Sequence, residues 1–205
     1  MNLTRNQIDT LTGLINTGVG RSAGVLNEMV NTCVYAQAPL IKAFSPLEAR
    51  KQLERVGGDR LATVQLLFKG PFSGTAALVF RHETASKLVS ILTREGLGSY
   101  DLDSVRTGTF SEVGSIVING IMDSIATVLE EPIRYSFPRY MEHTIEDLLT
   151  PSGFDSNAAV LLTRAYLMIE RLLVEGNVIL ILKVGSFDTL VEAIDTINMD
   201  SGAES

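Results

Sequence analysis

The order of expected helices and strands occurs twice along this chain, and corresponding landmarks in the two copies differ by 99 in residue number. Each copy begins with a long run in which apolar residues recur every three or four positions, the period of a helix with one buried face. Asn16 precedes Pro39 by 23 positions, and Ser115 precedes Pro138 by the same 23 positions. Because both landmarks keep their spacing, we interpret the chain as an internal duplication.

Each copy is expected to contain a long helix, a strand, a short helix, two further strands and a final helix. In the first copy these are residues 4–31, 34–44, a short helix starting at Ser45, and residues 60–69, 74–80 and 83–94. In the second copy they are residues 109–130, 133–138, 144–149, a strand within 158–171, then 178–183 and 187–197. Gly176 is expected to mark the turn between the last two strands.

These elements predict an α+β fold with one domain over residues 1–205. The two repeats span about residues 4–95 and 107–198, and an acidic tail follows at 199–205. Two copies most simply pair their strands in one antiparallel sheet. We therefore expect an internally duplicated, pseudo-twofold arrangement with both long helices on one face of that sheet.

The first long helix carries an unusual number of glycines. Gly13, Gly18, Gly20 and Gly24 lie inside its pattern, and each costs about 1 kcal/mol relative to alanine. We expect another backbone or a partner to approach this helix closely. Gly18-x-Gly20 is not a dinucleotide-binding loop, because no strand precedes it.

Composition excludes several classes of function. The formal net charge is −7 and no Lys/Arg cluster occurs, which argues against nucleic-acid binding. The most apolar region is interrupted by charged residues, so we expect no membrane span. Cys33, the only cysteine, is expected to be buried in a cytoplasmic protein without disulfides. His82 and His143 lack further placed ligands, so no metal site is expected.

A recurring motif connects the two halves to a known family. The spacing Asp/Ser-x3-Glu-x2-Asn-x22-Pro, with substitutions, is followed in both halves, and the chain opens Leu3-Thr4-x-x-Gln7-x-Asp9-x-Leu11. Over about residues 4–198 this resembles the CheC/CheX/FliY family of bacterial chemotaxis proteins. The resemblance implies a phosphatase that acts on phosphorylated CheY-like receiver domains. It implies no cofactor in this chain, because the receiver would carry the Mg²⁺.

The resemblance also assigns residues. In the family a helix glutamate pairs with a receiver lysine, and an asparagine three residues later aligns the water that attacks the aspartyl phosphate. Here the assignment gives catalytic roles to Glu112, Ser115 and Asn16, and partner-binding roles to Asp9 and Gly13. Asn119 lies one turn beyond the motif position on the same stripe, and we expect it to contribute to partner binding.

Neither half holds the complete pair, because Gly13 replaces the acid in the first and Ser115 replaces the amide in the second. Gly108 replaces the Asp/Ser of the second motif, which therefore matches at Glu112 and Pro138. We therefore expect reduced activity.

The physical chemistry is consistent with these roles, and structural alternatives exist for each residue. Phosphoryl transfer depends on positioning the water, and a carboxamide can both donate and accept hydrogen bonds. Glu112 has a structural alternative, since Thr109-x-x-Glu112 is also a capping-box pattern. Asn16 has the alternative of a packing amide, and Ser115 that of a small packing residue.

Three classes of function remain open. The first is an aspartyl-phosphate phosphatase of response regulators with reduced activity, which we favour. The second is a module that binds and sequesters phosphorylated receivers without hydrolysis. The third is a structural part similar to the middle domain of the flagellar switch proteins. The sequence does not indicate the cognate receiver or the oligomeric state.

Overall fold

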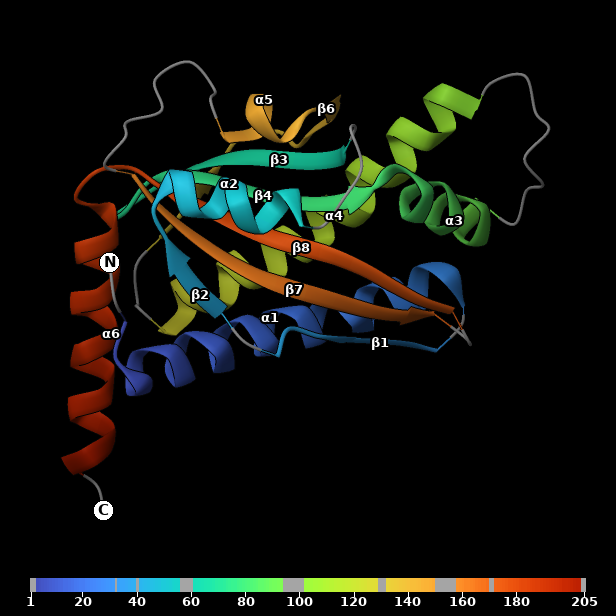
Figure 1. Ribbon diagram of the computed structural model, residues 1–205. Coiled ribbons are helices and arrows are strands. Elements are labelled where there is room, and N and C mark those ends of the chain that lie inside the picture. Colours follow the sequence, from blue (N-terminus) through green and yellow to red (C-terminus); the bar gives the residue numbers. More distant parts are fainter. Residues whose placement is uncertain are drawn as a thin grey trace.

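The computed structural model of the chain describes residues 3–31, 33–39, 41–55, 61–93, 102–128, 132–149, 158–169 and 172–203. The first repeat contains α1 Arg5–Val30, β1 Val34–Gln37, β2 Ile41–Phe44, α2 Pro46–Glu54, β3 Leu61–Lys69, β4 Gly74–Arg81 and α3 His82–Thr93. The second repeat contains α4 Leu102–Val128, β5 Arg134–Tyr135, β6 Arg139–His143, α5 Ile145–Leu149, β7 Ala159–Ile169, β8 Leu172–Leu182 and α6 Ser186–Ala203. The α+β fold class is confirmed (Figure 1).

The described strands form one antiparallel sheet whose order is symmetric with respect to the two repeats. The order is β1-β7-β8-β4-β3-β5, with β2 also paired to β7 and β6 also paired to β3. If each strand is replaced by its counterpart in the other repeat, the same order results, read in the opposite direction. A pseudo-twofold axis therefore passes between β4 and β8, and each repeat lends its first two strands to the other repeat's hairpin.

The strand register follows the 99-residue offset. Tyr35 pairs with Met168, and Lys69 pairs with Arg134. Tyr35 and Arg134 are 99 positions apart, and so are Lys69 and Met168. Each of the two pairs is therefore the counterpart of the other in the second repeat. The same offset relates the β2–β7 register to the β3–β6 register. The duplication predicted from two landmarks therefore extends to individual backbone pairs.

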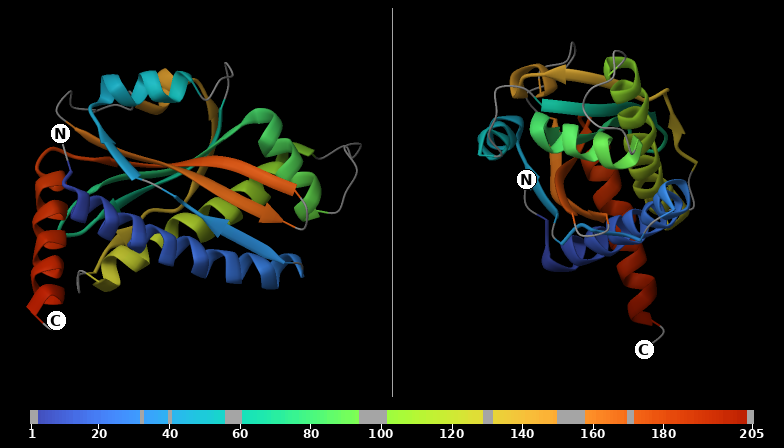
Figure 2. Two further views of the ribbon diagram at one scale, coloured as in Figure 1. Left: turned by 60° about the horizontal axis from the view of Figure 1, so that its bottom comes forward. Right: turned by 90° about the vertical axis from the view of Figure 1, so that its right-hand side faces the viewer.

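The sheet separates two apolar layers. On one face a large core combines side chains of α1, α3, α4 and α6 with those of the sheet, and α1 and α4 lie together along it (Figure 2). This confirms that both long helices occupy one face. On the other face a smaller core forms beneath α2 and α5, which contribute Ala49, Leu53, Leu148 and Leu149.

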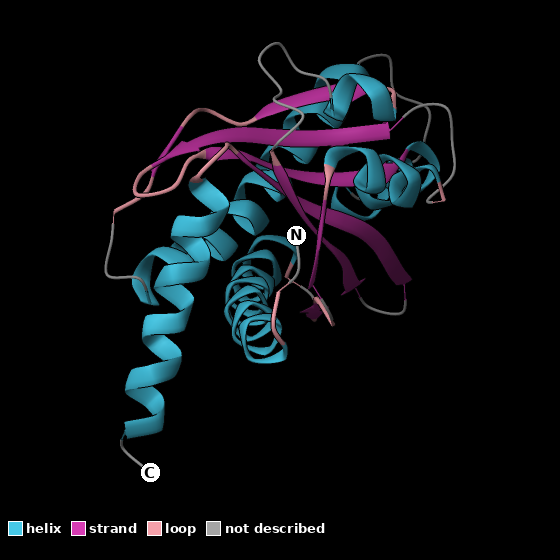
Figure 3. Ribbon diagram, turned by 60° about the vertical axis from the view of Figure 1, so that its left-hand side comes forward, coloured by secondary structure: helices cyan, strands magenta, loops and turns pink. Residues whose placement is uncertain are grey.

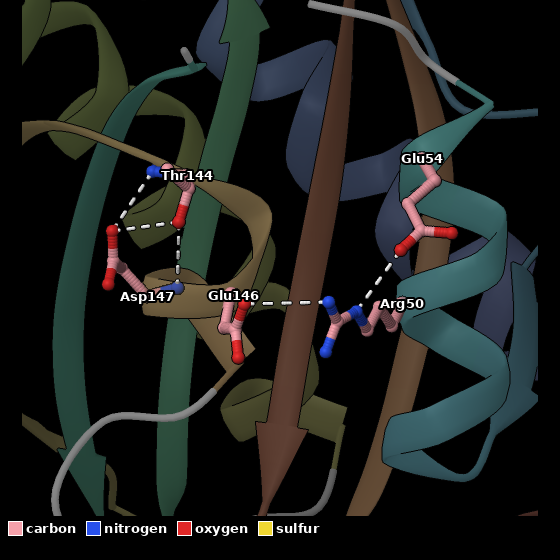
Figure 4. Close-up of polar contacts among 5 residues, drawn as sticks. All are labelled: Arg50, Glu54, Thr144, Glu146 and Asp147. Carbon is pink, nitrogen blue, oxygen red and sulfur yellow. Dashed lines mark hydrogen bonds and ion pairs between the residues drawn. The ribbon is translucent and has the colours of Figure 1, made fainter. Parts of the chain in front are cut away.

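The two short helices of the smaller layer begin in the same way. Ser45 and Glu48 form the hydrogen-bonded cap of α2. Thr144 and Asp147 form that of α5, which Figure 4 shows. The members of these caps are again 99 positions apart. Hydrogen bonds from the capping hydroxyl lower the pKa of Glu48 and of Asp147. The caps thus repeat in both sequence and geometry.

Arg50 links the two short helices across the face. Its guanidinium lies 3.1 Å from Glu54 within α2 and 3.5 Å from Glu146 of α5 (Figure 4). Because all three side chains are half-exposed, these ion pairs contribute little stability. The apolar residues beneath the helices hold the layer in place.

The last helix, α6, stands at one end of the sheet and packs against the start of α1 (Figure 3). Gln7 Nε2 donates to both carboxylate oxygens of Asp195, at 2.8 and 3.0 Å, and Thr10 Oγ1 donates to Asn198 Oδ1 at 2.7 Å. Gln7 also forms a capping box with Thr4. These contacts fix the first turn of α1 to the second repeat.

Glycines let the two long helices approach each other at one point. A Cβ on Gly18 would overlap the backbone of Gly120 and Ile121, and a Cβ on Gly120 would overlap Ser22 Oγ and the Gly18 carbonyl. Ser22 Oγ lies 2.9 Å from the carbonyl oxygen of Gly18 and 2.9 Å from that of Ile116, and its hydroxyl donates a shared hydrogen bond to both. Gly18 is therefore required by helix packing, as the predicted close approach demands. Gly13, Gly20 and Gly24 face open space.

Several expected boundaries differ from the structure. The single strand at residues 34–44 is two strands, because the chain leaves the ladder at Ala38 and Pro39 before pairing again with β7. The strand expected at 133–138 is likewise divided into β5 and β6. The second long helix begins at Leu102 rather than near Thr109. The expected connection at 95–101 lies outside the described residues.

Two residue-level expectations were wrong. Gly176 does not mark a turn, since it lies within β8 opposite Ala165, where a side chain would collide with the ring of Phe80. Cys33 is exposed rather than buried, because the helix ends at Val30 and the buried stripe ends with it. In addition, α6 continues to Ala203, past the residue at which we expected the tail to begin.

The helix crossing yields a matched pair of substitutions in α1. We expect Gly18→Ala to lower the free energy of unfolding by about 1–3 kcal/mol, because the added methyl group must force α1 from α4. Gly20→Ala should raise it by a few tenths to about 1 kcal/mol, because that position is open and alanine favours the helix. Urea denaturation measures both, and a stabilising Gly18→Ala would contradict the close crossing.

Candidate functional site

The candidate residues of the second repeat lie along the middle of α4. Glu112 is exposed, whereas Ser115 and Asn119 are half-buried. Their spacing of three and four residues places them on one stripe of the helix. Asn119 Nδ2 lies 3.1 Å from Ser115 Oγ and donates a hydrogen bond to it. The structure therefore brings these three side chains together in succession.

The environment of Glu112 removes its structural alternative. The capping-box interpretation is wrong, because Thr109 lies well inside a helix that starts at Leu102. Among the residues that the structure describes, Glu112 has no hydrogen bond or ion pair. Its carboxylate is thus free to bind a cation brought by a partner.

Asn119 carries an unusual polar group. Its Oδ1 is buried and has no hydrogen-bond partner among the described residues, while its Nδ2 is used by Ser115. An unpaired buried carbonyl typically costs 1–3 kcal/mol. The Asn119 amide therefore binds the Ser115 hydroxyl through Nδ2, and its carbonyl oxygen is turned away from solvent.

The candidates of the first repeat lie on α1 and differ from one another. Asp9 and Gly13 are exposed, and Gly13 adds no side chain to the surface. Asn16 is half-buried and its amide is fully engaged with the chain between β1 and β2. Asn16 Nδ2 donates to the carbonyls of Ala38 at 2.7 Å and Thr12 at 3.0 Å, and Asn16 Oδ1 accepts from the Ala38 N–H at 2.8 Å.

Asn16 therefore has a visible structural role. Ala38 is buried and sits where the chain leaves β1, so its backbone groups need partners inside the protein. Both ends of the Asn16 amide supply them. In this arrangement both N–H donors of the amide and one acceptor position of its oxygen are used within the chain, and the catalytic role assigned to Asn16 remains a prediction.

The corresponding place in the second repeat is built differently. Ser115 stands where Asn16 does, and Phe137 stands where Ala38 does, by the 99-residue offset. Among the described contacts no hydrogen bond joins Ser115 to Phe137. Instead, Ser136 binds the backbone of Leu67 in β3, and Phe137 is 91% exposed, compared with 1% for Ala38.

Tyr135 secures the near end of this segment to α4. Its hydroxyl donates to Asp123 Oδ1 at 2.8 Å. Burial, together with this hydrogen bond, raises the pKa of Tyr135 above its usual value, so the phenol stays protonated at neutral pH. The half-buried ring thus joins β5 to the helix that carries Glu112.

Sequence reasoning missed the contact between Asn16 and Ala38, although its signal was present. The motif fixes the distance from the asparagine to Pro39, and Ala38 is the residue before that proline. A constant spacing between a helix amide and a strand-end proline is expected if the amide holds the backbone there. The exposure of Phe137 had no comparable signal.

Other chemistry is sparse in the described part of the chain. No group of three or more His, Cys, Asp or Glu side chains there is arranged to hold a metal ion. Burial lowers the pKa of His143, and its Nε2 is buried without a described partner. None of the described helices combines the length and apolarity that crossing a membrane requires.

Comparison with known proteins shows the fold. FliY from Thermotoga maritima superposes with a TM-score of 0.75 at 14% sequence identity, over 96% of this chain and 100% of that chain. The FliM middle domain from H. pylori gives 0.63 at 11% identity, over 93% of this chain and 99% of that one. The chemotaxis protein CheX from Desulfovibrio desulfuricans gives 0.54 at 9% identity, over 83% and 99%.

No protein family and no curated protein matches the sequence itself. The resemblance to CheC/CheX/FliY proteins is thus confirmed at the level of the fold, which this chain shares with FliY, the FliM middle domain and CheX. Identities this low carry no assignment of activity or partner. The roles of Glu112, Ser115, Asn119, Asp9, Gly13 and Asn16 remain predictions.

The Asn16 contacts predict a stability effect. We expect Asn16→Ala to lower the free energy of unfolding by about 1–3 kcal/mol, because the buried Ala38 N–H and carbonyl lose their partners. Ser115→Ala, the matched change at the corresponding site, should cost less because one half-buried hydrogen bond is lost. Thermal or urea unfolding compares them, and an Asn16→Ala protein as stable as the wild type would contradict the structural role.

Proposed function

We propose that this protein binds a phosphorylated CheY-type receiver domain through α4 and dephosphorylates its aspartyl phosphate slowly. The observation that carries this proposal is the exposed carboxylate of Glu112, which has no partner among the described residues and lies three residues before a hydroxyl at Ser115. Because a helix displays residues i and i+3 side by side, both can face one docked protein. The fold shared with FliY and CheX supports the assignment to this class.

In this proposal Glu112 provides the binding contact. A receiver lysine beside the phosphorylated aspartate would form a charge-assisted hydrogen bond with the Glu112 carboxylate, which is stronger than a neutral one. Glu112 can form this bond without giving up another, since it has no described partner. Binding at α4 therefore requires no contact of the free protein to be broken at this side chain.

Ser115 would be the group nearest to the attacking water. Its hydroxyl can donate one hydrogen bond and accept two, and Asn119 already occupies one acceptor position at 3.1 Å. The O–H and the second acceptor position stay available to a water. The side chain is shorter than a carboxamide, so the water would be positioned less firmly and hydrolysis would be slow.

The first repeat contributes less to this function. Gly13 offers no group to a receiver, and the Asn16 amide is engaged with Ala38. Asp9 is exposed on the same helix but lies two turns from the carboxamide position. We therefore assign one receiver-binding site to the protein, on α4.

A structural role in a flagellar-switch-type assembly is the second candidate. The observation in its favour is that the chain superposes better on FliY and the FliM middle domain, at 0.75 and 0.63, than on CheX, at 0.54. In that case the surface of α4 would serve assembly rather than hydrolysis. A receiver-binding measurement separates the two candidates.

Restoring the carboxamide tests the catalytic part of the proposal. Ser115→Asn should raise the rate of phosphate release from a phosphorylated CheY-type receiver by about tenfold or more, because about 1.4 kcal/mol of transition-state stabilisation corresponds to a factor of ten. Gly13→Glu is the matched control on α1 and should change the rate less, since Asn16 is engaged. Release is followed with a phosphate sensor.

The outcomes of this assay are distinct. Binding of the phosphorylated receiver by the wild type, with no added phosphate release in either protein, would favour the sequestering module. An already rapid wild type that Ser115→Asn leaves unchanged would contradict reduced activity. Absence of both binding and release would favour the assembly role.

The binding contact is tested separately. Glu112→Ala should weaken the affinity for the phosphorylated receiver by about tenfold, the scale of one charge-assisted hydrogen bond, while leaving the unfolding free energy within about 0.5 kcal/mol because the side chain is exposed and unpaired. Glu28→Ala, another exposed acid on a long helix, is the control. Titration calorimetry with the receiver measures the affinity.

A further inference from the structure

Five exposed side chains gather where β3 meets β5 and β6. Lys69 lies opposite Arg134, and Arg139 lies opposite Gln65, two residues before Leu67. Phe137 lies in the connection between β5 and β6. We refer to this group as the cationic edge; it consists of Leu67, Lys69, Arg134, Phe137 and Arg139, all exposed.

The strand residues of the cationic edge lie on the face of the sheet away from α4. Side chains alternate along a strand, and Leu66 and Phe68 of β3 belong to the core beneath the long helices. Leu61 belongs to the opposite layer, so Leu67 and Lys69 face the same way as Leu61, and so do Arg134 and Arg139, which pair with Lys69 and Gln65. Phe137 lies in the connection between β5 and β6, to which the alternation does not apply.

The charges of this group are locally unbalanced. Like charges directly opposite in a sheet destabilise it, and Lys69 and Arg134 are such a pair in a chain of net charge −7. Within the described residues, no carboxylate forms an ion pair with Lys69, Arg134 or Arg139. An external anion would relieve this repulsion.

A pocket lies beside the two opposed cations. Its described lining is Lys69, Gly70, Pro71, Pro132 and Arg134, and its volume is about 470 Å³. A Cβ on Gly70 would come within 2.9 Å of the Pro132 carbonyl oxygen, so the glycine keeps this side of the pocket clear. The space admits a carboxylate together with part of the chain that carries it.

Two apolar side chains continue the surface from the pocket. Phe137 is 91% exposed and Leu67 is 55% exposed. Ser136 holds this part of the chain firmly, because its N–H donates to the Leu67 carbonyl and its Oγ accepts from the Leu67 N–H, each at 2.9 Å. An aromatic side chain displayed on a fixed backbone loses little entropy on binding and is a typical interface anchor.

We propose that the cationic edge binds an acidic peptide segment of another protein. A carboxylate of that segment enters the pocket between Lys69 and Arg134, and an apolar side chain packs on Phe137 and Leu67. Charge complementarity favours this occupant, since an acidic segment is repelled by the rest of the chain and attracted here. The two opposed cations face away from α4, so we expect a receiver bound at Glu112 to leave them accessible.

Selection from a displayed library of random peptides tests the proposal and does not require the natural partner to be identified first. The folded full-length protein is the bait, and Lys69→Glu/Arg134→Glu is the counter-selection bait. We expect the enriched peptides to contain acidic residues near an aromatic or aliphatic one. An enriched peptide, labelled with a fluorophore, is then titrated against variants by fluorescence anisotropy.

The variants distinguish the contacts. Lys69→Ala/Arg134→Ala and Phe137→Ser should each weaken binding at least tenfold, and added salt should weaken it further because the pairs are exposed. Lys42→Glu/Lys87→Glu changes the net charge as much as the counter-selection bait but lies elsewhere, and should leave binding within twofold. Glu112→Ala should also leave it within twofold.

Three results would overturn the proposal. These are enrichment of no peptide, enrichment of peptides without acidic residues, and binding that the Lys69, Arg134 and Phe137 substitutions do not change. Circular dichroism confirms that each variant is folded. Because no receiver is present in these measurements, their failure leaves the proposed function unaffected, and failure of the receiver assay leaves this inference unaffected.

Discussion

The arrangement of this protein depends on the close crossing of α1 and α4. At that point Gly18 and Gly120 place two backbones in contact, and the Ser22 hydroxyl reaches carbonyls on both helices. Any side chain at either glycine would separate the helices and lift them from the sheet. The crossing joins the repeats on the helical layer, as β4 and β8 join them in the sheet. The crossing thereby fixes the two long helices relative to each other. The stripes of these helices that face away from the core remain exposed to solvent.

Given that frame, the two repeats use equivalent positions for different purposes. On α1 a carboxamide at position 16 turns inward and supports the backbone at Ala38. On α4 the shorter Ser115 turns to Asn119, and the strand connection containing Phe137 is held by β3 instead. Among the described contacts, the helix amide holds both backbone groups of Ala38 in the first repeat, whereas in the second the helix holds the connection only at its near end, through Asp123 and Tyr135. The second repeat presents the exposed acid, Glu112, and the exposed aromatic ring.

Much of the fold was predictable because its causes are local or repetitive. Apolar periodicity indicated α1, the sequence indicated a short helix starting at Ser45, and the 99-residue offset implied the pairing of the repeats. The start of α4 was not predictable in the same way. Thr109 and Glu112 imitate a cap, yet the helix runs through them from Leu102. Gly176 was misinterpreted because the ring of Phe80 that excludes a side chain there is distant in sequence.

The choice of candidate residues follows from the sequence, whereas their geometry does not. The motif spacing points to Glu112, Ser115 and Asn16, and Asn119 follows on the same stripe. Sequence cannot tell which way an amide turns. That direction depends on whether a buried backbone group nearby lacks a partner, as at Ala38. The same reasoning applies to the sheet edges, where Tyr35 and Met168 in one repeat correspond to Lys69 and Arg134 in the other.

The sheet pairs these positions in the same register in both repeats. The backbone hydrogen bonding is therefore the same whether the side chains are apolar or cationic. Duplication thus preserved the frame that hydrogen bonding and packing require and left the outward-facing pairs free to diverge. A protein built in this way can carry different surfaces on edges that the fold makes equivalent.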